Sequence, residues 1–310
     1  MRLVFLGTPR IAATCLEEIH RSGLHEIVAV GTHPDRPQRR GLKLLPTAVK
    51  ETALRLGLPV IEVSDAKDPA FAQELTALQT DLLVVVAFVI LPPAVLGATR
   101  LGAVNLHGSL LPRWRGAAPV QRSVEAGESV TGATVFRLDS GVDTGGIVAT
   151  ESVQVGMEET SGEILERLAA LGGGLLLRAL AHLQAHPEDR GIPQDQALAT
   201  KAPKLFPEEG CIDWTLGAKA IHDKVRAFNP APGAWTKPDG KLLKIWKTRM
   251  PTDSVQAGIG QAIRLADGRV VAGCADGVLE LLELQPEGRA RQAGRDWFNG
   301  LRATGAVSLS

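Results

Sequence analysis

An amide and an imidazole lie two residues apart in the segment GAVNLHG, residues 102–108. Alternate side chains of a strand share one face, so a strand here would place Asn105 and His107 side by side. Open α/β sheets bind ligands beyond the carboxyl ends of their strands, where both residues would lie. The two groups could stabilise a developing oxyanion and manage a proton. An ordinary hydrogen-bonded Asn and His at a strand end is an alternative that the spacing alone leaves open.

A carboxylate, Asp143, lies in the glycine-rich segment LDSGVDTGGI, residues 138–147. The glycines indicate a tight loop after a strand. A carboxylate in that loop could reach His107 and raise its pKa. The alternative is an Asx-turn, in which the side chain only caps its own loop.

The first part of the chain alternates apolar runs with amphipathic stretches, which is typical of βαβ units and a parallel sheet. The run LLVVVA is apolar at every position, as a strand covered on both faces requires. We predict a doubly wound, mostly parallel α/β domain over residues 1–186. The expected strands are Arg2–Gly7, Glu26–Thr32, Asp81–Ala87 and Gly102–His107, and the expected helices are Ile11–Ser22, Thr47–Leu56 and Pro69–Leu78.

The sequence also predicts a later helix, with a well-defined start and with glycines in its middle that disfavour a continuous helix. Thr160 and Glu163 have the spacing of a capping box, which predicts a helix that runs towards His186. Gly172–Gly174 lies inside it, and each glycine costs a helix about 1 kcal/mol relative to alanine. We therefore expect a break or bend at these glycines.

The pattern changes after residue 186. Prolines at 187, 193, 203 and 207 among polar residues predict a linker over residues 187–207. Residues 208–310 contain short apolar runs separated by Asp-Gly pairs, which favour hairpins and a small β-barrel. The expected elements are a helix at Gly217–Phe228 and strands at Leu242–Trp246, Gln261–Leu265, Val270–Gly273 and Val278–Leu284.

Composition and missing motifs exclude several classes of protein. The three cysteines, Cys15, Cys211 and Cys274, show no paired spacing, which argues against a disulfide framework and a zinc ribbon. No apolar run reaches the ~18 residues of a membrane span, so we expect a cytoplasmic protein. Neither GxGxxG nor GxxxxGK[ST] occurs, so NAD-dependent hydride transfer and ATP-dependent phosphoryl transfer lose their main support. No cluster of side chains predicts a metal site.

The combination of motifs is more specific than any of them alone. N-x-H-x-SLLPxxRGAAP followed by D-x-G-x-D-T-G resembles the 10-formyltetrahydrofolate-dependent formyltransferases. The resemblance implies that Asn105, His107 and Asp143 form the catalytic set. It also implies a folate site, formed by the loop Ser109, Leu110, Leu111 and Pro112 and bordered by Phe88 and Val89. The co-substrate would be 10-formyltetrahydrofolate, without a metal.

The resemblance extends over nearly the whole chain. Residues 33–50 are similar to a basic loop of the methionyl-tRNA formyltransferases, and residues 212–214, 226–235 and 244–247 are similar to their C-terminal domain. This implies initiator methionyl-tRNA as the partner of a monomeric enzyme. The C-terminal β-barrel would be OB-like and bind tRNA. The basic loop, which has few apolar residues and should be mobile, would contribute Arg36, Arg39, Arg40 and Lys43.

The chain departs from the family pattern at three places. Phe88–Pro92 is one residue shorter than the usual segment and lacks its glycine. Arg10 and Ile11 replace an acidic residue and a phenylalanine, and Ala231 stands where relatives often carry tryptophan. The first departure borders the expected folate pocket, and none removes the catalytic set.

The resemblance implies a mechanism in which the α-amine of methionyl-tRNA attacks the formyl carbon. Asn105 and a protonated His107 would stabilise the formyl oxygen, and Asp143 would accept the amine proton through water. A formyltransferase for an amino sugar or glycinamide ribonucleotide is the main alternative, which the basic loop and C-terminal domain argue against. A non-enzymatic RNA-binding protein is a second, which the intact Asn105, His107 and Asp143 argue against.

Overall fold

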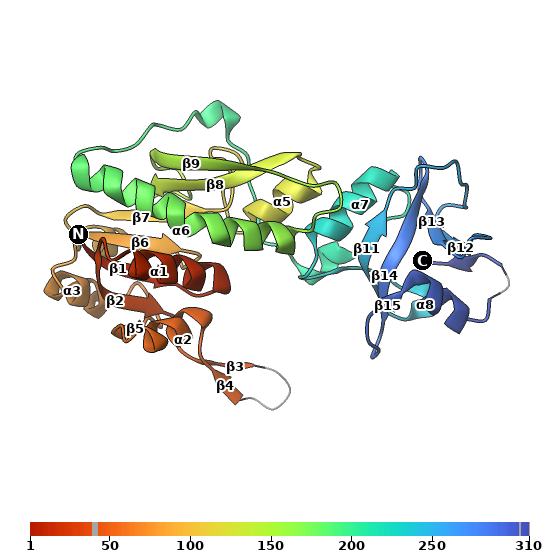
Figure 1. Cartoon of the computed structure of the whole chain (residues 1–310), viewed down its shortest axis with the longest axis horizontal. Helices are drawn as coiled ribbons and strands as arrows, with labels where there is room; N and C mark the ends of the chain where they lie inside the picture. The colour runs from red at the N-terminus through yellow and green to blue at the C-terminus, as the bar shows by residue number, and fades with distance from the viewer. Residues whose placement is uncertain (39–42, 304, 310) are drawn as a thin grey trace. The chain divides into compact units, whose positions relative to one another are not determined.

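The computed structural model describes residues 1–38, 43–303 and 305–309 (Figure 1). Its contacts divide the chain into two compact units. The first unit comprises Met1–Pro119, Thr131–Val153 and Leu165–Ala202, and the second comprises Val120–Val130, Gln154–Ile164 and Pro203–Ser310. Two short segments that are flanked in sequence by parts of the first unit therefore belong to the second unit.

A mostly parallel sheet forms the centre of the first unit, as predicted. Its strands are β1 (Arg2–Gly7), β2 (Glu26–Thr32), β5 (Val60–Glu62), β6 (Leu82–Val86), β7 (Ala103–His107), β8 (Val130–Arg137) and β9 (Ile147–Gln154). Their order is β5-β2-β1-β6-β7-β8-β9. The pairs from β5 to β7 are parallel, and β8 is antiparallel to β7. The strand that carries Asn105 and His107 is thus an interior strand.

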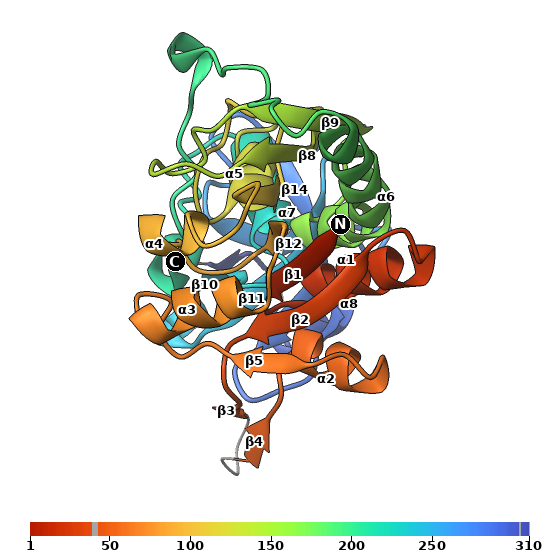
Figure 2. The same ribbon diagram turned by 90° about the vertical axis from the view of Figure 1, so that its left-hand side faces the viewer.

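Helices cover both faces of this sheet (Figure 2). They are α1 (Arg10–Ser22), α2 (Ala48–Arg55) and α6 (Ser161–Ala185) on one face, and α3 (Pro69–Ala77) and α4 (Pro93–Leu96) on the other. All five residues of β6 are buried, as its uninterrupted apolar sequence predicts for a central strand. Phe71 and Leu75 of α3 pack with Leu83 and Val85 of β6 in one core cluster. The core on this face of the sheet is therefore formed between α3 and β6.

Helix α6 begins as predicted and continues without the predicted break. Glu163 accepts hydrogen bonds from the backbone N–H and the hydroxyl of Thr160, so the capping box forms. The helix then runs unbroken to Ala185. A Cβ atom on Gly172 would lie 2.7 Å from the side chain of Leu106, and one on Gly173 would lie 2.6 Å from Glu18. The glycines thus allow close packing against β7 and α1, which offsets their low helix propensity.

Residues 187–202 are fixed to the first unit by backbone and side-chain contacts. Ile192 forms an antiparallel bridge with Ile147, and Lys201 forms a parallel bridge with Arg115. The buried guanidinium of Arg137 donates to the carbonyl oxygens of Leu101 and Asp189 at 2.7 Å each. The proline-rich sequence predicted only a linker, because proline and polar residues give no periodic signal for packing of this kind.

An antiparallel sheet forms the second unit. Its strands are β10 (Ala234–Thr236), β11 (Leu243–Arg249), β12 (Gln261–Arg264), β13 (Val270–Gly273), β14 (Val278–Pro286), β15 (Gln292–Ala293) and β16 (Val307–Ser308). They accompany α5 (Pro119–Glu125), α7 (Ala218–Ala227) and α8 (Gly294–Gly300). The order is β10-β11-β14-β13-β12-β16, with β15 on β14. The hydroxyl of Thr236 on β10 donates to the carbonyl oxygen of Leu309, beside β16, so the two ends of the sheet approach each other.

The basic segment contains a short hairpin rather than an irregular loop. Strand β3 (Arg36–Gln38) pairs with β4 (Lys43–Leu45) in antiparallel register, with Arg36 opposite Leu45. No periodic pattern indicated this pairing, because each strand is only three residues long. Arg39 and Arg40 lie outside the described residues, and the predicted tRNA contacts of this segment stay predictions.

Within residues 1–38, 43–303 and 305–309, no helix is long and apolar enough to cross a bilayer. The same residues contain no group of three or more His, Cys, Asp or Glu side chains that could hold a metal ion.

Candidate active site

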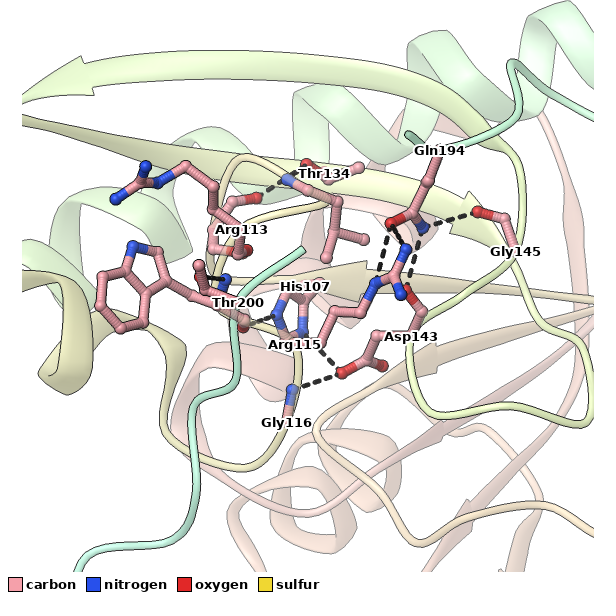
Figure 3. Close-up of polar contacts among 12 residues, drawn as sticks. His107, Arg113, Arg115, Gly116, Thr134, Asp143, Gly145, Gln194 and Thr200 are labelled. Carbon is pink, nitrogen blue, oxygen red and sulfur yellow. Dashed lines mark hydrogen bonds and ion pairs between the residues drawn. The ribbon is translucent and has the colours of Figure 1, made fainter. Parts of the chain in front are cut away.

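Strand register positions the amide and the imidazole. Asn105 lies opposite Val85 of β6 and Phe136 of β8, and His107 lies opposite Thr134 of β8. Both side chains leave the same face of β7, because side chains alternate along a strand. Asn105 is half-buried and His107 is 6% exposed. The structure therefore brings these two predicted residues together at the carboxyl end of β7. Figure 3 shows the surroundings of His107.

The ring of His107 has two different neighbours. Nε2 lies 2.8 Å from the carbonyl oxygen of Trp114, and Nδ1 lies 3.6 Å from Oδ2 of Asp143. A carbonyl oxygen only accepts hydrogen bonds, so Nε2 carries the hydrogen. In the neutral ring Nδ1 then presents its lone pair to the carboxylate. His107 and Asp143 together form a site that can hold one additional proton.

Asp143 reaches towards His107 and does not cap its own loop. Its Oδ2 accepts a hydrogen bond from the backbone N–H of Gly116 at 2.8 Å. Asp139 fills the local capping role instead, since its Oδ1 accepts from the backbone N–H of Gly141 at 2.9 Å and from the hydroxyl of Thr144 at 2.7 Å. The Asx-turn alternative thus describes Asp139, and Asp143 stays available to the imidazole.

Burial lowers the pKa of His107 below its usual value. The charge of Asp143 and the hydrogen bond to Trp114 act in the opposite direction and do not overcome this burial. The neutral imidazole therefore predominates at pH 7, which differs from the protonated ring that the sequence led us to expect. Asp143 raises the pKa as predicted, but desolvation of a ring so deeply buried has the larger effect.

A small cavity adjoins the pair. Asn105 and Asp143 line it together with Phe88, Val89 and Ile90. The other lining residues are Val85, Leu91, Leu96, Leu138, Asp139, Gly141 and Val142. Among the described residues, the Asn105 side chain has no hydrogen-bond partner, so its amide is available to a ligand. Four of the predicted site residues thus line the cavity. His107 does not line it, but its Nδ1 lies 3.6 Å from Oδ2 of Asp143, which does.

The predicted folate loop, Ser109–Pro112, does not line this cavity. Ser109 and Leu111 are buried. Ser109 donates from its hydroxyl to the carbonyl oxygen of Arg113 at 2.7 Å, and its own carbonyl accepts from the hydroxyl of Thr134 at 2.7 Å. These bonds fix the start of the loop that returns at Trp114 to His107. In this structure the segment positions the imidazole.

Residues that sequence reasoning missed support this loop. The hydroxyl of Thr200 accepts from the backbone N–H of Trp114 at 2.8 Å. Gly116 has φ of +125°, and a Cβ atom there would lie 2.6 Å from the carbonyl oxygen of Ala202. Gln194 contacts both Arg115 and the loop of Asp143. In the sequence, only Arg115 and Gly116 of the RGAAP motif pointed to this supporting contact. Gln194 and Thr200 lie in a segment without periodicity, so no pattern indicated them.

Comparison with known proteins shows which family the chain resembles. The sequence profile described as formyl transferase matches residues 1–180, and the profile of the formyl transferase C-terminal domain matches residues 204–302. The chain is 41% identical over 306 residues to a methionyl-tRNA formyltransferase of Chlamydia muridarum, covering 97% of this chain and 96% of that protein.

Two solved structures share the fold at low identity. HypX from Aquifex aeolicus, solved with tetrahydrofolic acid, matches with a TM-score of 0.65 and 17% identity over 98% of this chain, which spans about half (48%) of HypX. An N-formyltransferase from Helicobacter canadensis, solved with folinic acid and dTDP-3-aminofucose, matches with a TM-score of 0.66 and 17% identity over 92% of this chain and 98% of that one. On these profile matches and the 41% identity to the Chlamydia muridarum protein, the chain belongs to the formyl transferase family.

Proposed function

We propose that this formyltransferase moves the formyl group of 10-formyltetrahydrofolate onto the α-amino group of initiator methionyl-tRNA. The observation that carries the proposal is the 41% identity to a methionyl-tRNA formyltransferase over 97% of the chain. The grouping of Asn105, His107 and Asp143 at one strand end supports it, because these side chains supply an amide donor and a proton-accepting pair.

The proposed reaction uses a neutral amine as the nucleophile. An α-amine has a pKa near ~8, so a useful fraction is unprotonated at pH 7. Its nitrogen bonds to the formyl carbon, and negative charge grows on the formyl oxygen. The Asn105 amide, which has no hydrogen-bond partner in the part of the chain that the structure describes, donates to that oxygen. Because Nε2 of His107 already donates to Trp114, His107 serves in proton transfer in place of the donor role that the sequence suggested.

The His107–Asp143 pair accepts the proton that the amine loses. The two groups face each other through a lone pair and a carboxylate oxygen at 3.6 Å, an arrangement that a shared proton stabilises. The bond between the formyl carbon and N10 of the folate then breaks, and the pair returns the proton to N10 as tetrahydrofolate leaves. The net change is one C–N bond formed and one broken, with no metal or redox step.

The cavity offers suitable walls for a folate ring. Its apolar sides and its polar edge at Asn105, Asp139 and Asp143 match a flat heterocycle with polar substituents. Its volume of about 90 Å³ is small beside the ~300–1,000 Å³ of most ligand pockets. We therefore propose that the exposed side chains of Val89 and Ile90 move aside when folate binds, and that much of the ligand lies outside the cavity.

The remaining assignments concern the tRNA. We propose a catalytic domain over residues 1–186, a connecting segment over 187–207 whose residues 187–202 pack on that domain, and a C-terminal OB-like barrel over 208–310 that binds tRNA. Residues 201–310 carry 16 Lys and Arg against 12 Asp and Glu, which favours an anionic partner. Arg36, Arg39, Arg40 and Lys43 are proposed to contact phosphates. We also propose that the protein acts as a monomer in the cytoplasm, where translation is initiated.

A small acceptor is the principal alternative. The fold of the Helicobacter canadensis N-formyltransferase covers 92% of this chain, so a C-terminal domain alone does not argue for tRNA. The C-terminal domain was one of two features of the sequence, with the basic loop, that argued against a small acceptor, and this argument is now weaker. The high identity to the Chlamydia muridarum protein and the basic residues at 36–43 still favour tRNA.

One assay tests the proposal directly. The protein is incubated with 10-formyltetrahydrofolate and methionyl-tRNA, the ester is hydrolysed, and formylmethionine is detected by its mass. Parallel reactions contain glycinamide ribonucleotide or a nucleotide-linked amino sugar. Formylmethionine without formylation of the small acceptors is the expected result, and the opposite pattern would refute the tRNA assignment.

A further inference from the structure

A glutamine far from the catalytic motifs in sequence has a fully occupied side chain beside them. Gln194 is 8% exposed. Its Nε2 donates to the backbone carbonyl oxygens of Asp143 at 2.9 Å and Gly145 at 2.8 Å. Its Oε1 accepts from Nε of Arg115 at 3.0 Å and from Nη2 at 2.6 Å. Figure 3 shows the amide between the guanidinium and the loop of Asp143.

The chemistry of its partners fixes the orientation of this amide. A guanidinium only donates and a backbone carbonyl oxygen only accepts, so the oxygen of Gln194 must face Arg115 and its nitrogen must face the loop. Both N–H groups and both lone pairs are then used. No other uncharged side chain of this length offers two donors and a double acceptor on opposite edges.

The two segments that Gln194 connects are those that hold the His107–Asp143 pair. Arg115 lies between Trp114, whose carbonyl accepts from His107, and Gly116, whose N–H donates to Asp143. The other edge of the amide binds the backbone of Asp143 itself. Arg115, Gln194 and Asp143 therefore complete a closed circuit of hydrogen bonds around the pair.

Asp143 needs this support because of its backbone conformation. Its φ is +53°, a left-handed conformation that residues other than glycine rarely adopt. Such conformations persist only where the surroundings hold them. The two hydrogen bonds from Nε2 of Gln194 hold the carbonyls at Asp143 and Gly145, on either side of Thr144.

We propose that Gln194 is a positioning residue for formyl transfer, which sets the separation of the Asp143 carboxylate and the His107 ring by joining the two loops that carry their partners. The inference rests on the proposed roles of His107 and Asp143. Gln194 touches neither the cavity nor the reacting atoms, so its influence passes through Asp143 and Arg115.

Gln194→Met tests the proposal with little change in volume or charge. Loss of the amide frees the loop of Asp143, and kcat should fall roughly 10- to 100-fold, since a displacement of about 1 Å at a catalytic group has that effect. The KM values for folate and methionyl-tRNA should change less than about threefold. The matched control is Gln196→Met, because Gln196 is exposed and accepts from Nη1 of Arg115 at 2.8 Å without contacting the loop.

The pH profile of kcat separates positioning from a general structural role. Asp143 is the titratable group that faces His107, and its charge raises the pKa of the ring. If the carboxylate withdraws in Gln194→Met, the pKa of His107 falls and the acidic limb moves to lower pH. A merely structural role would scale the activity equally at every pH.

A second variant covers the case in which Gln194→Met does not fold. Gln194→Glu keeps an acceptor for Arg115 and removes both donors to the loop, so kcat should fall by a similar factor in a protein that remains folded. If wild type formylates methionyl-tRNA while Gln194→Met and Gln194→Glu both match Gln196→Met, the inference is overturned. If wild type itself does not formylate methionyl-tRNA, the proposed function fails instead.

Discussion

The two members of the proposed proton-accepting pair are held by different kinds of structure. His107 ends an interior strand, and the hydrogen bonds of β7 with β6 and β8 set its place. Asp143 lies in a loop with φ of +53°, and its carboxylate is placed by single hydrogen bonds from Gly116 and, through the backbone, from Gln194. One partner is thus fixed by many shared backbone contacts and the other by a few individual ones.

Because of this difference, we expect substitutions that lower stability and substitutions that lower the catalytic rate to lie in different parts of the site. A strand between two neighbours loses its position only when the sheet itself is damaged, which destabilises the whole domain. A loop that depends on individual side chains can move by about 1 Å while the protein stays folded, and such movement lowers the rate. Substitutions in the loop supports should therefore affect kcat more than stability, and substitutions in the strand core should do the reverse.

The largest effect is expected from removal of the reacting groups themselves. Asn105→Ala and His107→Ala should each lower kcat by roughly 100-fold or more, the scale of losing a donor to a developing oxyanion or a proton-transfer group. Steady-state formylation of methionyl-tRNA measures kcat, and thermal unfolding confirms that each variant is folded. Turnover near that of wild type in either variant would contradict its assignment.

Asp143→Asn should have a smaller effect on rate and a distinct effect on pH dependence. The substitution keeps the shape of the side chain and removes its charge, and kcat should fall roughly 10- to 100-fold. Asp143 raises the pKa of His107 against the lowering effect of burial. Without the charge this pKa falls further, so the ring stays neutral to lower pH and the acidic limb of kcat moves to lower pH.

An unchanged limb in Asp143→Asn would mean that the charge does not act on the reacting imidazole. The difference between the strand that holds His107 and the loop that holds Asp143 would then have no bearing on catalysis. Asp139→Asn is the matched control, because Asp139 caps the same loop through Gly141 and Thr144 without contacting His107. It should leave the position of the limb unchanged.

The regular part of the molecule follows from the sequence because its signals are periodic. The uninterrupted apolar run at 82–86 gave a buried central strand, and the period of two placed Asn105 and His107 on one face. Thr160 and Glu163 gave the start of α6 through a local side-chain bond. Each of these features depends on residues that are close in sequence or repeat at a fixed spacing.

The rest depends on contacts between distant residues that leave no such signal. Position 172 of α6 requires a glycine because a Cβ atom there would collide with Leu106, which is more than 60 residues earlier in the sequence. Gln194 and Thr200 support the loop of Arg115 from about 80 residues away. The neutral state of His107 depends on its burial, which no spacing of residues reveals.

Thr200→Val tests the irregular support by itself. The change keeps the branched shape and removes the hydroxyl that accepts from the N–H of Trp114. We expect kcat to fall roughly 10-fold, because the carbonyl at Trp114 positions His107, and stability to fall by only about 1 kcal/mol. Chemical denaturation and steady-state kinetics on the same preparation measure the two effects.

Leu106→Ala is the opposite case on β7. Leu106 is buried between the two catalytic positions and packs beside Gly172. Truncation of a buried leucine should reduce the free energy of unfolding by about 2–5 kcal/mol, while kcat of the folded protein stays within about threefold. If Thr200→Val lowers stability more than Leu106→Ala does, the proposed division between strand and loop is wrong.

The smallest effect is expected at the basic segment that bears the β3–β4 hairpin. Four basic residues lie between positions 36 and 43, and phosphate contacts gain free energy from release of counterions. Arg40→Ala should raise KM for methionyl-tRNA and leave folate binding unchanged. The loss of kcat/KM should be severalfold at low salt. The slope of log(kcat/KM) against log salt concentration should decrease by about one, as expected for the loss of one phosphate contact.

The salt dependence decides between a phosphate contact and a charge that serves only solubility. At low ionic strength the Debye length is long and an electrostatic contact is least screened, so a true contact shows its largest effect there. Arg21→Ala is the control, since Arg21 is an exposed arginine of α1 whose ion pair is with Glu18. Measurements of kcat/KM at low and moderate salt compare the two variants with wild type. If Arg40→Ala has no effect at low salt, or matches Arg21→Ala at both concentrations, Arg40 does not contact the tRNA.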